Sequence, residues 1–310
     1  MAMALFFAMC LDAWLGEPRW LWSRVAHPAV MMGRAVGWLD QRFNTRDSRL
    51  EGLIAFAALV IGAGLLGWAL ALLPGRWIDL LIGAVLLAQK SLVEHVKAVQ
   101  EGLRSSLDDG RRAVAMIVSR DTGQMDESDV ARSAIESAAE NFSDGVIAPA
   151  FWFLIGGLPA LLIYKITNTA DSMIGYRTPR HEKFGWAAAR FDDLLNWIPA
   201  RVTAVIIGLA CPGARLAPVR RDAKLHRSPN AGWPEAAMAY GLQIALSGPR
   251  RYGGVMTDYA FVNADGKRDL GADDIAAAIR VLWISWGMAL TLVVAIGLVG
   301  RVVMTVFSLW

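Results

Sequence analysis

The chain has 310 residues, of which 55% are hydrophobic and only 19% are charged, and its formal net charge is +3. Soluble chains usually carry about 25% charged residues, so this composition favours a protein of the lipid bilayer and excludes a disordered chain. The small net charge gives no reason to expect a nucleic-acid partner, and the presence of only two Cys excludes a disulfide scaffold.

The first long apolar segments predict a helical hairpin in the membrane. A helix needs about 20 apolar residues to cross roughly 30 Å of hydrocarbon, and residues 53–73 meet this requirement without a charged residue. Residues 77–88 are shorter and contain Asp79. Because they follow a Pro-Gly turn, we predict that they form the return arm of the hairpin.

Three further segments are apolar enough to enter the membrane. Residues 146–164 carry no charge, but a Gly-Gly-Leu-Pro sequence interrupts their middle, which favours a broken or re-entrant helix. Residues 202–214 are a weaker candidate, and residues 281–300 predict a complete span.

Basic residues concentrate in four hydrophilic stretches, 16–52, 90–145, 165–201 and 215–280. The positive-inside rule favours the cytoplasmic side for such stretches. A full crossing by residues 146–164 would put 165–201 outside, although that stretch is as basic as the others. We therefore favour re-entry of 146–164, with a full crossing as the alternative.

The first polar cluster lies on a helix predicted over residues 127–142. Arg132, Glu136, Glu140 and Asp144 recur every four residues, which places them on one helical face. Two carboxylates one turn apart can hold a Mg²⁺ ion that also binds substrate phosphates. The alternative is a solvent-exposed face with an Arg132–Glu136 surface ion pair. The same cluster includes Arg120, Asp121 and Asn141.

The second polar cluster follows the interrupted apolar segment. Lys165, Asn168, Asp171 and Ser172 fall on a single helical face. A polar stripe that emerges from membrane depth is costly unless it is paired or lines a cavity. The alternative is that these residues only cap the membrane interface. Tyr176 and Arg177 complete this cluster.

The third polar cluster lies just before residues 202–214. Asp192 and Asn196 are one turn apart, and Arg190 and Arg201 flank them. Acidic ligands combined with guanidinium groups suit a metal-bridged phosphate. Juxtamembrane charges at the head of a span are the alternative. Asp193 belongs to the same cluster.

The fourth polar cluster is strongly basic and leads into a loop. His226, Ser228 and Asn230 lie where the basic run meets this loop, and a helix is predicted to begin near Glu235. The run suits an anionic ligand, and contact with lipid headgroups is an equally good alternative. His27, near the N-terminus, is either a phosphate or acid–base group or a structural histidine.

Composition and spacing therefore predict an all-α, polytopic membrane protein. It has about four to five hydrophobic segments and large basic cytoplasmic loops, and residues 1–310 form a single membrane-embedded domain. The sequence contains no phosphate-binding glycine motif and no zinc-ligand spacing. The clusters suit Mg²⁺-dependent chemistry on phosphorylated or acidic substrates.

The ordered motifs resemble the adenosylcobinamide-phosphate synthase family of cobalamin biosynthesis. Each motif alone is weak evidence, but together they follow the family's order over most of the chain. The matching pieces are Leu11–Gly16, His27-Pro28, Arg120–Thr122, Glu136–Asn141, Asn168–Met173, Arg190–Asp193, Asn196–Arg201 and Ser228–Gly232.

This resemblance implies an ATP-dependent acid–amine ligase of the inner membrane with its active side in the cytoplasm. Its substrates would be a corrinoid, adenosylcobyric acid, and an aminoalcohol or its phosphate. Other membrane enzymes of cobalamin assembly are possible partners. We assign catalysis to Glu136, Glu140, Asp171 and Lys165, with the first three as Mg²⁺ ligands. Substrate binding is assigned to His27, Arg120, Asp121, Asn141, Asp144, Asn168, Ser172, Tyr176, Arg177, Arg190, Asp192, Asp193, Asn196, Arg201, His226, Ser228 and Asn230.

Two other functions compete with this one. An intramembrane Mg²⁺-dependent phospho- or prenyltransferase-like enzyme would need two Asp-rich motifs, and only the stretch Asp192–Asn196 approaches one. A transporter would be expected to carry ionisable residues within its spans, and residues 53–73 and 281–300 have none.

Overall fold

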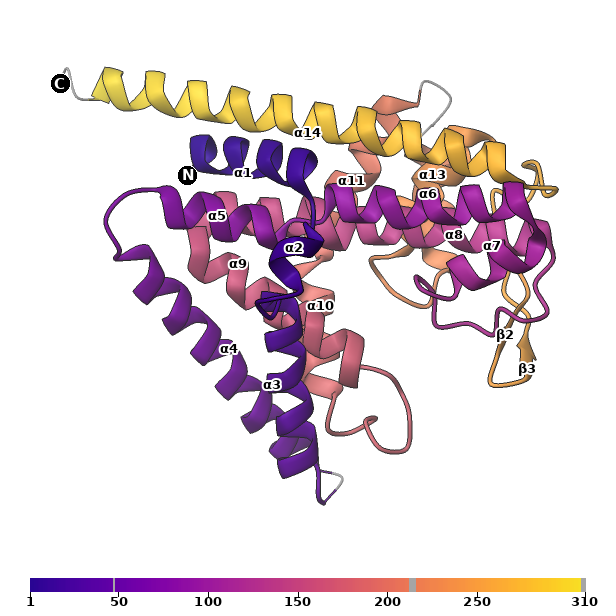
Figure 1. Ribbon diagram of the computed structural model, residues 1–310, viewed down its shortest axis with the longest axis horizontal. Coiled ribbons are helices and arrows are strands. Elements are labelled where there is room, and N and C mark those ends of the chain that lie inside the picture. The colour runs from indigo at the N-terminus through magenta and orange to yellow at the C-terminus, as the bar shows by residue number, and fades with distance from the viewer. Residues whose placement is uncertain (47, 212–215, 308–310) are drawn as a thin grey trace. The chain divides into compact units, whose positions relative to one another are not determined.

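Helices form nearly all the regular structure of the computed structural model, which describes residues 1–46, 48–211 and 216–307 (Figure 1). This confirms the all-α prediction. The helices are α1 (Ala2–Leu15), α2 (Arg19–Trp22), α3 (Pro28–Phe43), α4 (Arg49–Ala71), α5 (Trp77–Leu86), α6 (Gln89–Ser105), α7 (Leu107–Val114), α8 (Glu127–Phe142), the π-helix η1 (Ser143–Ile147), α9 (Ala148–Ile174), α10 (Trp186–Leu195), α11 (Trp197–Ala210), α12 (Leu216–Asp222), the 3-10 helix η2 (Ala223–Leu225), α13 (Gly232–Leu242) and α14 (Ala272–Phe307).

Short strands occur between α13 and α14. They are β1 (Leu246–Ser247), β2 (Arg250–Tyr252), β3 (Val255–Thr257) and β4 (Phe261–Val262). The pairs β1–β4 and β2–β3 are both antiparallel. Gly253 and Gly254 form the β2–β3 turn with φ values of 55° and 80°, which glycine adopts without the strain that a Cβ atom would add.

The chain divides into two compact units, each assembled from separated stretches. The first unit comprises Met1–Ala88, Ala148–Asn196 and Leu290–Trp310, and the second comprises Gln89–Ile147 and Trp197–Ala289. Because each unit draws on distant parts of the sequence, neither is an ordinary contiguous domain. The single-domain assignment stays a prediction.

Three helical stretches are long and apolar enough to cross a membrane, namely α4, Glu127–Ile174 and Ala272–Thr305. A fourth results if α10 and α11 count as one broken span. In α4, only 17% of the most apolar window is buried within the protein, so most of this helix is available to lipid. The multi-pass prediction is confirmed.

The predicted return arm of the hairpin differs from the expectation. Helix α5 has 10 residues, which at 1.5 Å per residue span about half of the hydrocarbon layer. It packs against α1 within the first unit (Figure 1). The hairpin over residues 53–88 is therefore not two complete spans, and it does not by itself place 16–52 and 90–145 on one side of the membrane.

The interruption predicted within residues 146–164 is confirmed. Helix α9 is broken at Gly156 (φ −130°, ψ 17°) and Gly157 (φ 61°, ψ −151°), two residues before Pro159. Re-entry or crossing of this segment stays a prediction. In the weaker candidate 202–214, α11 ends at Ala210, and residues 212–214 lie outside the described part of the chain.

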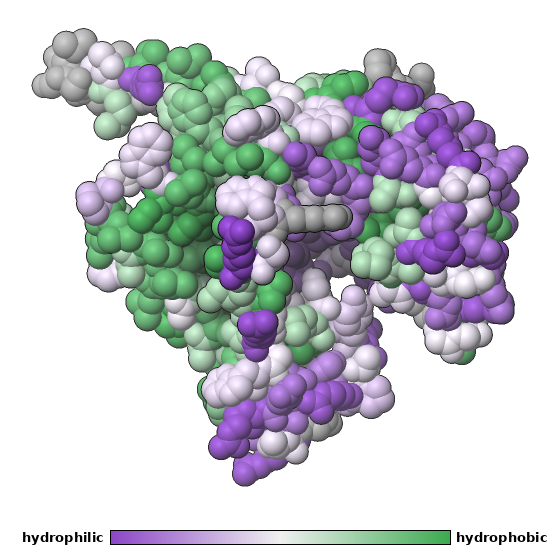
Figure 2. Space-filling view, viewed as in Figure 1, coloured by the Kyte–Doolittle hydropathy of each residue, from purple (hydrophilic) through white to green (hydrophobic). Residues whose placement is uncertain are grey.

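In the first unit, α4 packs along α9, and α3 and α10 complete the arrangement (Figure 1). Its buried core includes Val36, Phe56, Ile166 and Phe184. On the visible face of this unit, apolar side chains gather over α4 and α5 (Figure 2), where Ile61, Leu65 and Trp68 are among the exposed ones.

In the second unit, α6 packs against α7 and α8, and α11 packs against α13. Helix α8 spans the 127–142 helix predicted from the sequence, and the Asp126 carboxylate caps its N-terminus by accepting the Asp129 N–H at 2.8 Å. Most of its side chains are buried, including Val130, Ile135 and Phe142. Arg132 and Glu136 of α8 are buried as well.

Candidate functional site

Glu136 is the centre of a buried ion cluster in the second unit. Its side chain is 1% exposed, and its Oε2 atom pairs with Arg120 and, at 3.2 Å, with Arg250. Its Oε1 atom accepts the backbone N–H of Ser247 at 2.6 Å. One carboxylate thus holds two guanidinium groups that the sequence places far apart.

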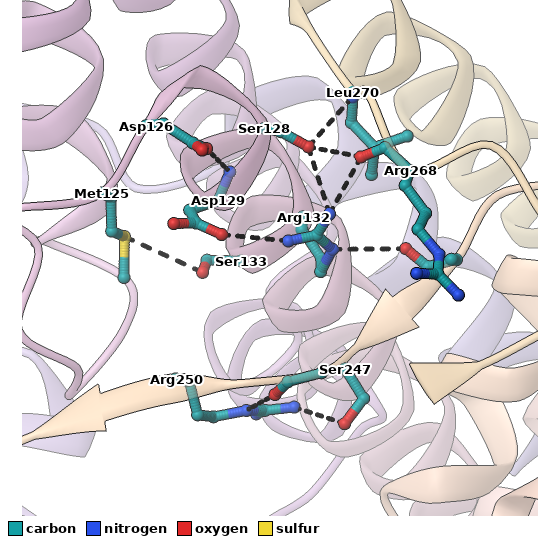
Figure 3. A network of polar contacts seen from close by, with 12 residues as sticks. Met125, Asp126, Ser128, Asp129, Arg132, Ser133, Ser247, Arg250, Arg268 and Leu270 are labelled. Carbon is teal, nitrogen blue, oxygen red and sulfur yellow. Dashed lines mark hydrogen bonds and ion pairs between the residues drawn. The ribbon is translucent and has the colours of Figure 1, made fainter. Parts of the chain in front are cut away.

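The surface ion pair considered for Arg132 and Glu136 is excluded by this arrangement. Arg132 points elsewhere on α8 and donates to the Asp129 carboxylate at 3.0 Å (Figure 3). It also donates to Ser128 Oγ at 3.1 Å and to the carbonyl oxygen of Arg268 at 2.9 Å. Its guanidinium joins α8 to the segment that precedes α14.

The sequence predictions missed Ser247 and Arg250. Arg250 donates from Nη2 to Ser247 Oγ at 2.6 Å (Figure 3), and its guanidinium lies 5.0 Å from the centre of the Tyr259 ring. Ser247 has a φ of 62°, a strained value for a residue with a side chain. The available sequence signal was the basic pair Arg250–Arg251 directly before the Gly-Gly turn.

Glu235 was not predicted as a site residue either. Its side chain is 2% exposed, and its Oε2 atom has no hydrogen-bond partner among the described residues. Burial raises the pKa of Glu235 well above its usual value, and the negative charges of Glu136 and Glu140 raise it further. Both effects favour the protonated form of Glu235.

His226 lies beside Glu235, with its Nε2 atom 3.6 Å from Oε1 of that carboxyl. Its Nδ1 atom accepts the Ser228 N–H at 3.0 Å. Burial lowers the pKa of His226 to about 4, and the positive charges of Arg250 and Arg227 contribute. The imidazole is therefore neutral at pH 7, with its proton on Nε2.

Glu140, Asn141 and Asp144 continue the predicted polar stretch in the second unit. Glu140 is half-buried one turn after Glu136, and its charge interacts with those of Arg120 and Arg250. Asn141 is exposed and donates to the Ser137 carbonyl at 2.8 Å. Asp144 lies in η1. Glu140 shares the charged neighbours Arg120 and Arg250 with Glu136.

Arg201 and Asn230 meet in the second unit. The Arg201 guanidinium lies 4.4 Å from the Trp197 ring centre and 4.8 Å from that of Trp233. It donates to Asn230 Oδ1 at 3.3 Å. Ser228 Oγ accepts the Asn230 N–H at 3.2 Å, which fixes the loop. The two indole rings hold Arg201 in one orientation.

A second polar site lies in the first unit around Asp192. Its Oδ2 atom accepts from Asn196 at 2.9 Å, and its Oδ1 atom accepts from Asn168 at 3.4 Å. Tyr164, which was not predicted, donates its hydroxyl to Asn196 Oδ1 at 3.0 Å. These contacts bring Asn168 of the second predicted cluster next to Asp192 and Asn196 of the third.

The other predicted residues of the first unit include Asp171, whose charge interacts with that of Asp192. Arg190 pairs with Asp193 at 3.5 Å, and Ser172 donates to the Asn168 carbonyl oxygen at 2.9 Å. Lys165 and Asp171 lie on α9, and Tyr176 and Arg177 are exposed beyond its end.

His27 has a structural role in the first unit. Its Nδ1 atom accepts the Ala29 N–H at 3.1 Å, which caps the N-terminus of α3. The ring also packs edge-on against Trp22 at 4.4 Å. Its Nε2 atom is buried and has no hydrogen-bond partner among the described residues, so a substrate role for His27 stays a prediction.

The donors around Glu136 do not fit a Mg²⁺ ligand. Both of its oxygens already accept from N–H groups, two of them on guanidinium cations, and a dication there would face those positive charges. Within the described residues, no group of three His, Cys, Asp or Glu side chains could hold a metal ion. Glu140 lies in the second unit and Asp171 in the first, and their metal role stays a prediction.

Comparison with known proteins gives a consistent result. A family model described as CobD/Cbib protein matches residues 5–282. A Brucella anthropi protein named "Cobalamin biosynthesis protein CobD" is 47% identical over 319 residues, which cover 96% of this chain and 98% of the relative. Proteins of the same name from Rhizobium meliloti and Rhodobacter capsulatus are 46% and 44% identical and cover 90% and 88% of this chain, and 91% and 90% of the relatives. No solved structure matches.

Proposed function

This chain belongs to the CobD/Cbib protein family and acts in cobalamin biosynthesis, and we propose that it is the adenosylcobinamide-phosphate synthase of that pathway. It joins adenosylcobyric acid to an aminoalcohol or its phosphate through an amide bond, and it consumes ATP. The observation that carries this proposal is the buried cluster of Glu136, Arg120 and Arg250. Glu136 and Arg120 belong to the resemblance motifs, and Arg250 is a second cation from outside them.

The proposed amide-forming reaction requires cations and a proton acceptor. A carboxylate is a poor electrophile, so it is first activated, most simply as an acyl phosphate, which is a mixed anhydride. Fixed guanidinium groups stabilise the transferring phosphoryl group, and Arg120 and Arg250 are held for this purpose by Glu136. When bound to ATP, Mg²⁺ neutralises part of the phosphate charge. We propose it only as the companion ion of ATP, because Glu136 does not fit a metal ligand.

The amine attacks only in its neutral form, so a base must take its proton. Three glutamates interact in the second unit, namely Glu136, Glu140 and Glu235. Glu136 is engaged with two arginines, and Glu235 is only 2% exposed, with a pKa that burial raises. Glu140 is the one with appreciable exposure, and we assign it as the proton acceptor.

We propose the cytoplasmic side of the inner membrane as the place of reaction. ATP is a cytoplasmic substrate, and the basic stretches 90–145, 165–201 and 215–280 favour that side by the positive-inside rule. Three long apolar helical stretches support a multi-pass protein that stays in the bilayer. Other membrane enzymes of cobalamin assembly are the partners that this location would bring together.

The transferase alternative has less support. It needs Asp side chains that are open to a metal-bound diphosphate, whereas the Asp192 carboxylate accepts from the amides of Asn168 and Asn196. The stretch Asp192–Asn196 remains the one approach to an Asp-rich motif among the predicted clusters.

The proposal is tested by a product assay. Membranes that contain the full-length protein are supplied with adenosylcobyric acid, Mg-ATP and aminopropanol phosphate, and the corrinoid amide is measured by mass spectrometry. We expect product that depends on ATP and on the amine. Absence of the amide, with the protein folded and present in the membrane, would refute the proposed reaction.

A further inference from the structure

A pocket opens in the second unit next to the ion cluster. Its cavity volume is about 90 Å³, below the range of about 300–1,000 Å³ common for sites that enclose a whole small molecule, so it suits one group of a ligand rather than an entire ligand. Its walls come from residues 120–125, the first turns of α8 and the segment 247–256. The charged residues that line it are Arg120, Asp121, Asp129, Arg132, Arg250 and Arg251.

The charge of this lining favours an anion. Four guanidinium groups face two carboxylates, so positive charge is in excess along the pocket wall. Guanidinium N–H groups match the oxygens of a phosphate and can bind two of them at once. A phosphomonoester carries a charge of about −1.5 to −2 at neutral pH, which suits this excess better than a single carboxylate does.

Two of the arginines are held rigidly before any ligand arrives. The side chains of Arg120 and Arg250 are 12% and 10% exposed, and both pair with Glu136 behind them. Arg120 also donates to Ser133 Oγ at 2.9 Å, and Arg250 donates to Ser247 Oγ at 2.6 Å. Because these side chains are already ordered, a ligand that binds them loses little free energy to side-chain ordering, which favours tight binding.

The β2–β3 hairpin forms one rim of the pocket and is fixed to the opposite rim. The Asp121 carboxylate accepts the Gly254 N–H at 2.7 Å, and the Asp121 N–H donates to the Arg251 carbonyl oxygen at 3.2 Å. The Arg251 guanidinium donates to Gln124. The hairpin therefore keeps Arg250 and Arg251 next to Arg120, although they lie far apart in sequence.

We propose that this pocket binds the phosphate group of a phosphorylated substrate, either ATP or the aminoalcohol phosphate. The choice of these two substrates rests on the proposed function, whereas the anion site rests on the pocket itself. The corrinoid is much larger than either of them and is not the occupant. This inference assigns phosphate binding to Arg250 and Arg251 and makes Glu136 a positioning residue.

Direct binding to the full-length protein in detergent micelles tests this inference. Isothermal titration uses two probes, a non-hydrolysable ATP analogue and aminopropanol phosphate. Arg251→Gln removes a cation at the pocket rim. We expect the affinity for one probe to fall by about tenfold or more, because a hydrogen bond to a charged group contributes about 1.5–3 kcal/mol. The probe whose affinity falls identifies the substrate that occupies the pocket.

Two variants control this result. Arg104→Gln removes a second-unit arginine that pairs with Asp273 at 2.9 Å outside the pocket, and it should bind both probes within about twofold of the parent. Asp129→Asn removes a negative charge from the pocket wall and the ion pair with Arg132, so it should bind the same phosphate several-fold more tightly. The affinities for adenosine and aminopropanol, which lack phosphate, should be the same in the parent and in these variants.

The outcomes separate the pocket from the reaction. Loss of phosphate affinity in Arg251→Gln, with no amide formed by the parent, would support the pocket and reject the proposed function. Amide formation by the parent, with Arg251→Gln and Arg104→Gln binding both probes alike, would reject the pocket. A parent protein that binds neither phosphate would also reject it.

Discussion

At the residue scale, the two neighbouring glutamates of α8 have different environments. Glu136 is 1% exposed and holds two arginines, whereas Glu140 is half-buried one turn later. Sequence spacing predicted that they share a helical face but gave them the same metal-binding role. In the structure, Glu136 orients two cations, whereas Glu140 is exposed enough to contact a substrate.

A matched pair of substitutions tests this difference. Glu136→Gln leaves two buried guanidinium groups without their carboxylate, and breaking such a pair costs about 3–5 kcal/mol of unfolding free energy. Glu140→Gln should keep nearly the parent stability. Both variants should lose at least about 100-fold in turnover, within the contribution of a proton acceptor or of fixed cations.

Thermal unfolding in detergent and the amide assay provide the two measurements. Parent-like melting of Glu136→Gln would show that Glu136 does not hold the arginines in solution. Parent-like turnover of Glu140→Gln would remove Glu140 as the proton acceptor.

His226 predicts a pH dependence of stability. Its pKa is about 4 in the folded protein and about 6.5 when unfolded. Below pH 6.5 His226 takes up a proton in the unfolded state but stays neutral in the folded state until the pH approaches 4. The free energy of unfolding therefore falls as the pH drops from 6.5 towards 4, by about 2 kcal/mol between pH 6.5 and 5.

His226→Gln should remove this part of the acid sensitivity. The raised pKa of Glu235 acts in the opposite direction, because its contribution is lost as the pH rises, so the comparison is made between parent and variant at each pH. Melting temperatures at pH 7.5 and 5 provide the measurement. An equal acid-induced decrease in both proteins would contradict the neutral, buried His226.

At the scale of the elements, the helices were largely predictable and their partners were not. The helix over 127–142 was predicted with polar residues that recur every four positions, and the break in α9 followed from its Gly and Pro residues. The burial of Glu136 depends on Ser247 and Arg250. Nothing in local spacing connects such distant residues, so only the tertiary structure reveals that half of the site.

The close approach of α4 and α9 predicts a position that tolerates no side chain. A Cβ atom at Gly67 would lie 2.6 Å from the Cα atom of Pro159, so Gly67→Ala requires the backbone to move and should cost about 1–3 kcal/mol. Gly62, on the same helix, has no neighbouring atom within 4 Å of a Cβ, so Gly62→Ala serves as the control.

The two alanine variants are compared by thermal unfolding in detergent. Gly67→Ala should melt at a lower temperature than the parent, and Gly62→Ala should match the parent or exceed it slightly, because alanine favours helix. Equal melting of both variants would contradict the packing of α4 on the broken segment of α9.

At the scale of the whole molecule, membrane topology remains the main prediction from sequence. We expect 90–145, 165–201 and 215–280 to face the cytoplasm. Gly123, Lys183 and Asp265 are exposed positions in these stretches. Each is replaced by Cys in a background without Cys10 and Cys211, and intact cells are treated with a membrane-impermeant thiol reagent.

We expect labelling of all three positions only after the cells are opened. Labelling of Lys183→Cys from outside would show that residues 146–164 cross the membrane completely. A Cys introduced in an independently established periplasmic loop of another protein serves as the positive control for reagent access.

The division of the chain into two interleaved units has a consequence for its synthesis. The first unit begins at Met1 but also needs the stretch Leu290–Trp310, whereas the second needs nothing after Ala289. A ribosome that makes the chain in order therefore delivers every residue of the second unit before the first can be completed. The first unit therefore stays incomplete until the stretch Leu290–Trp310 has been made, and a nonsense mutation within that stretch would damage it without removing a residue of the second unit.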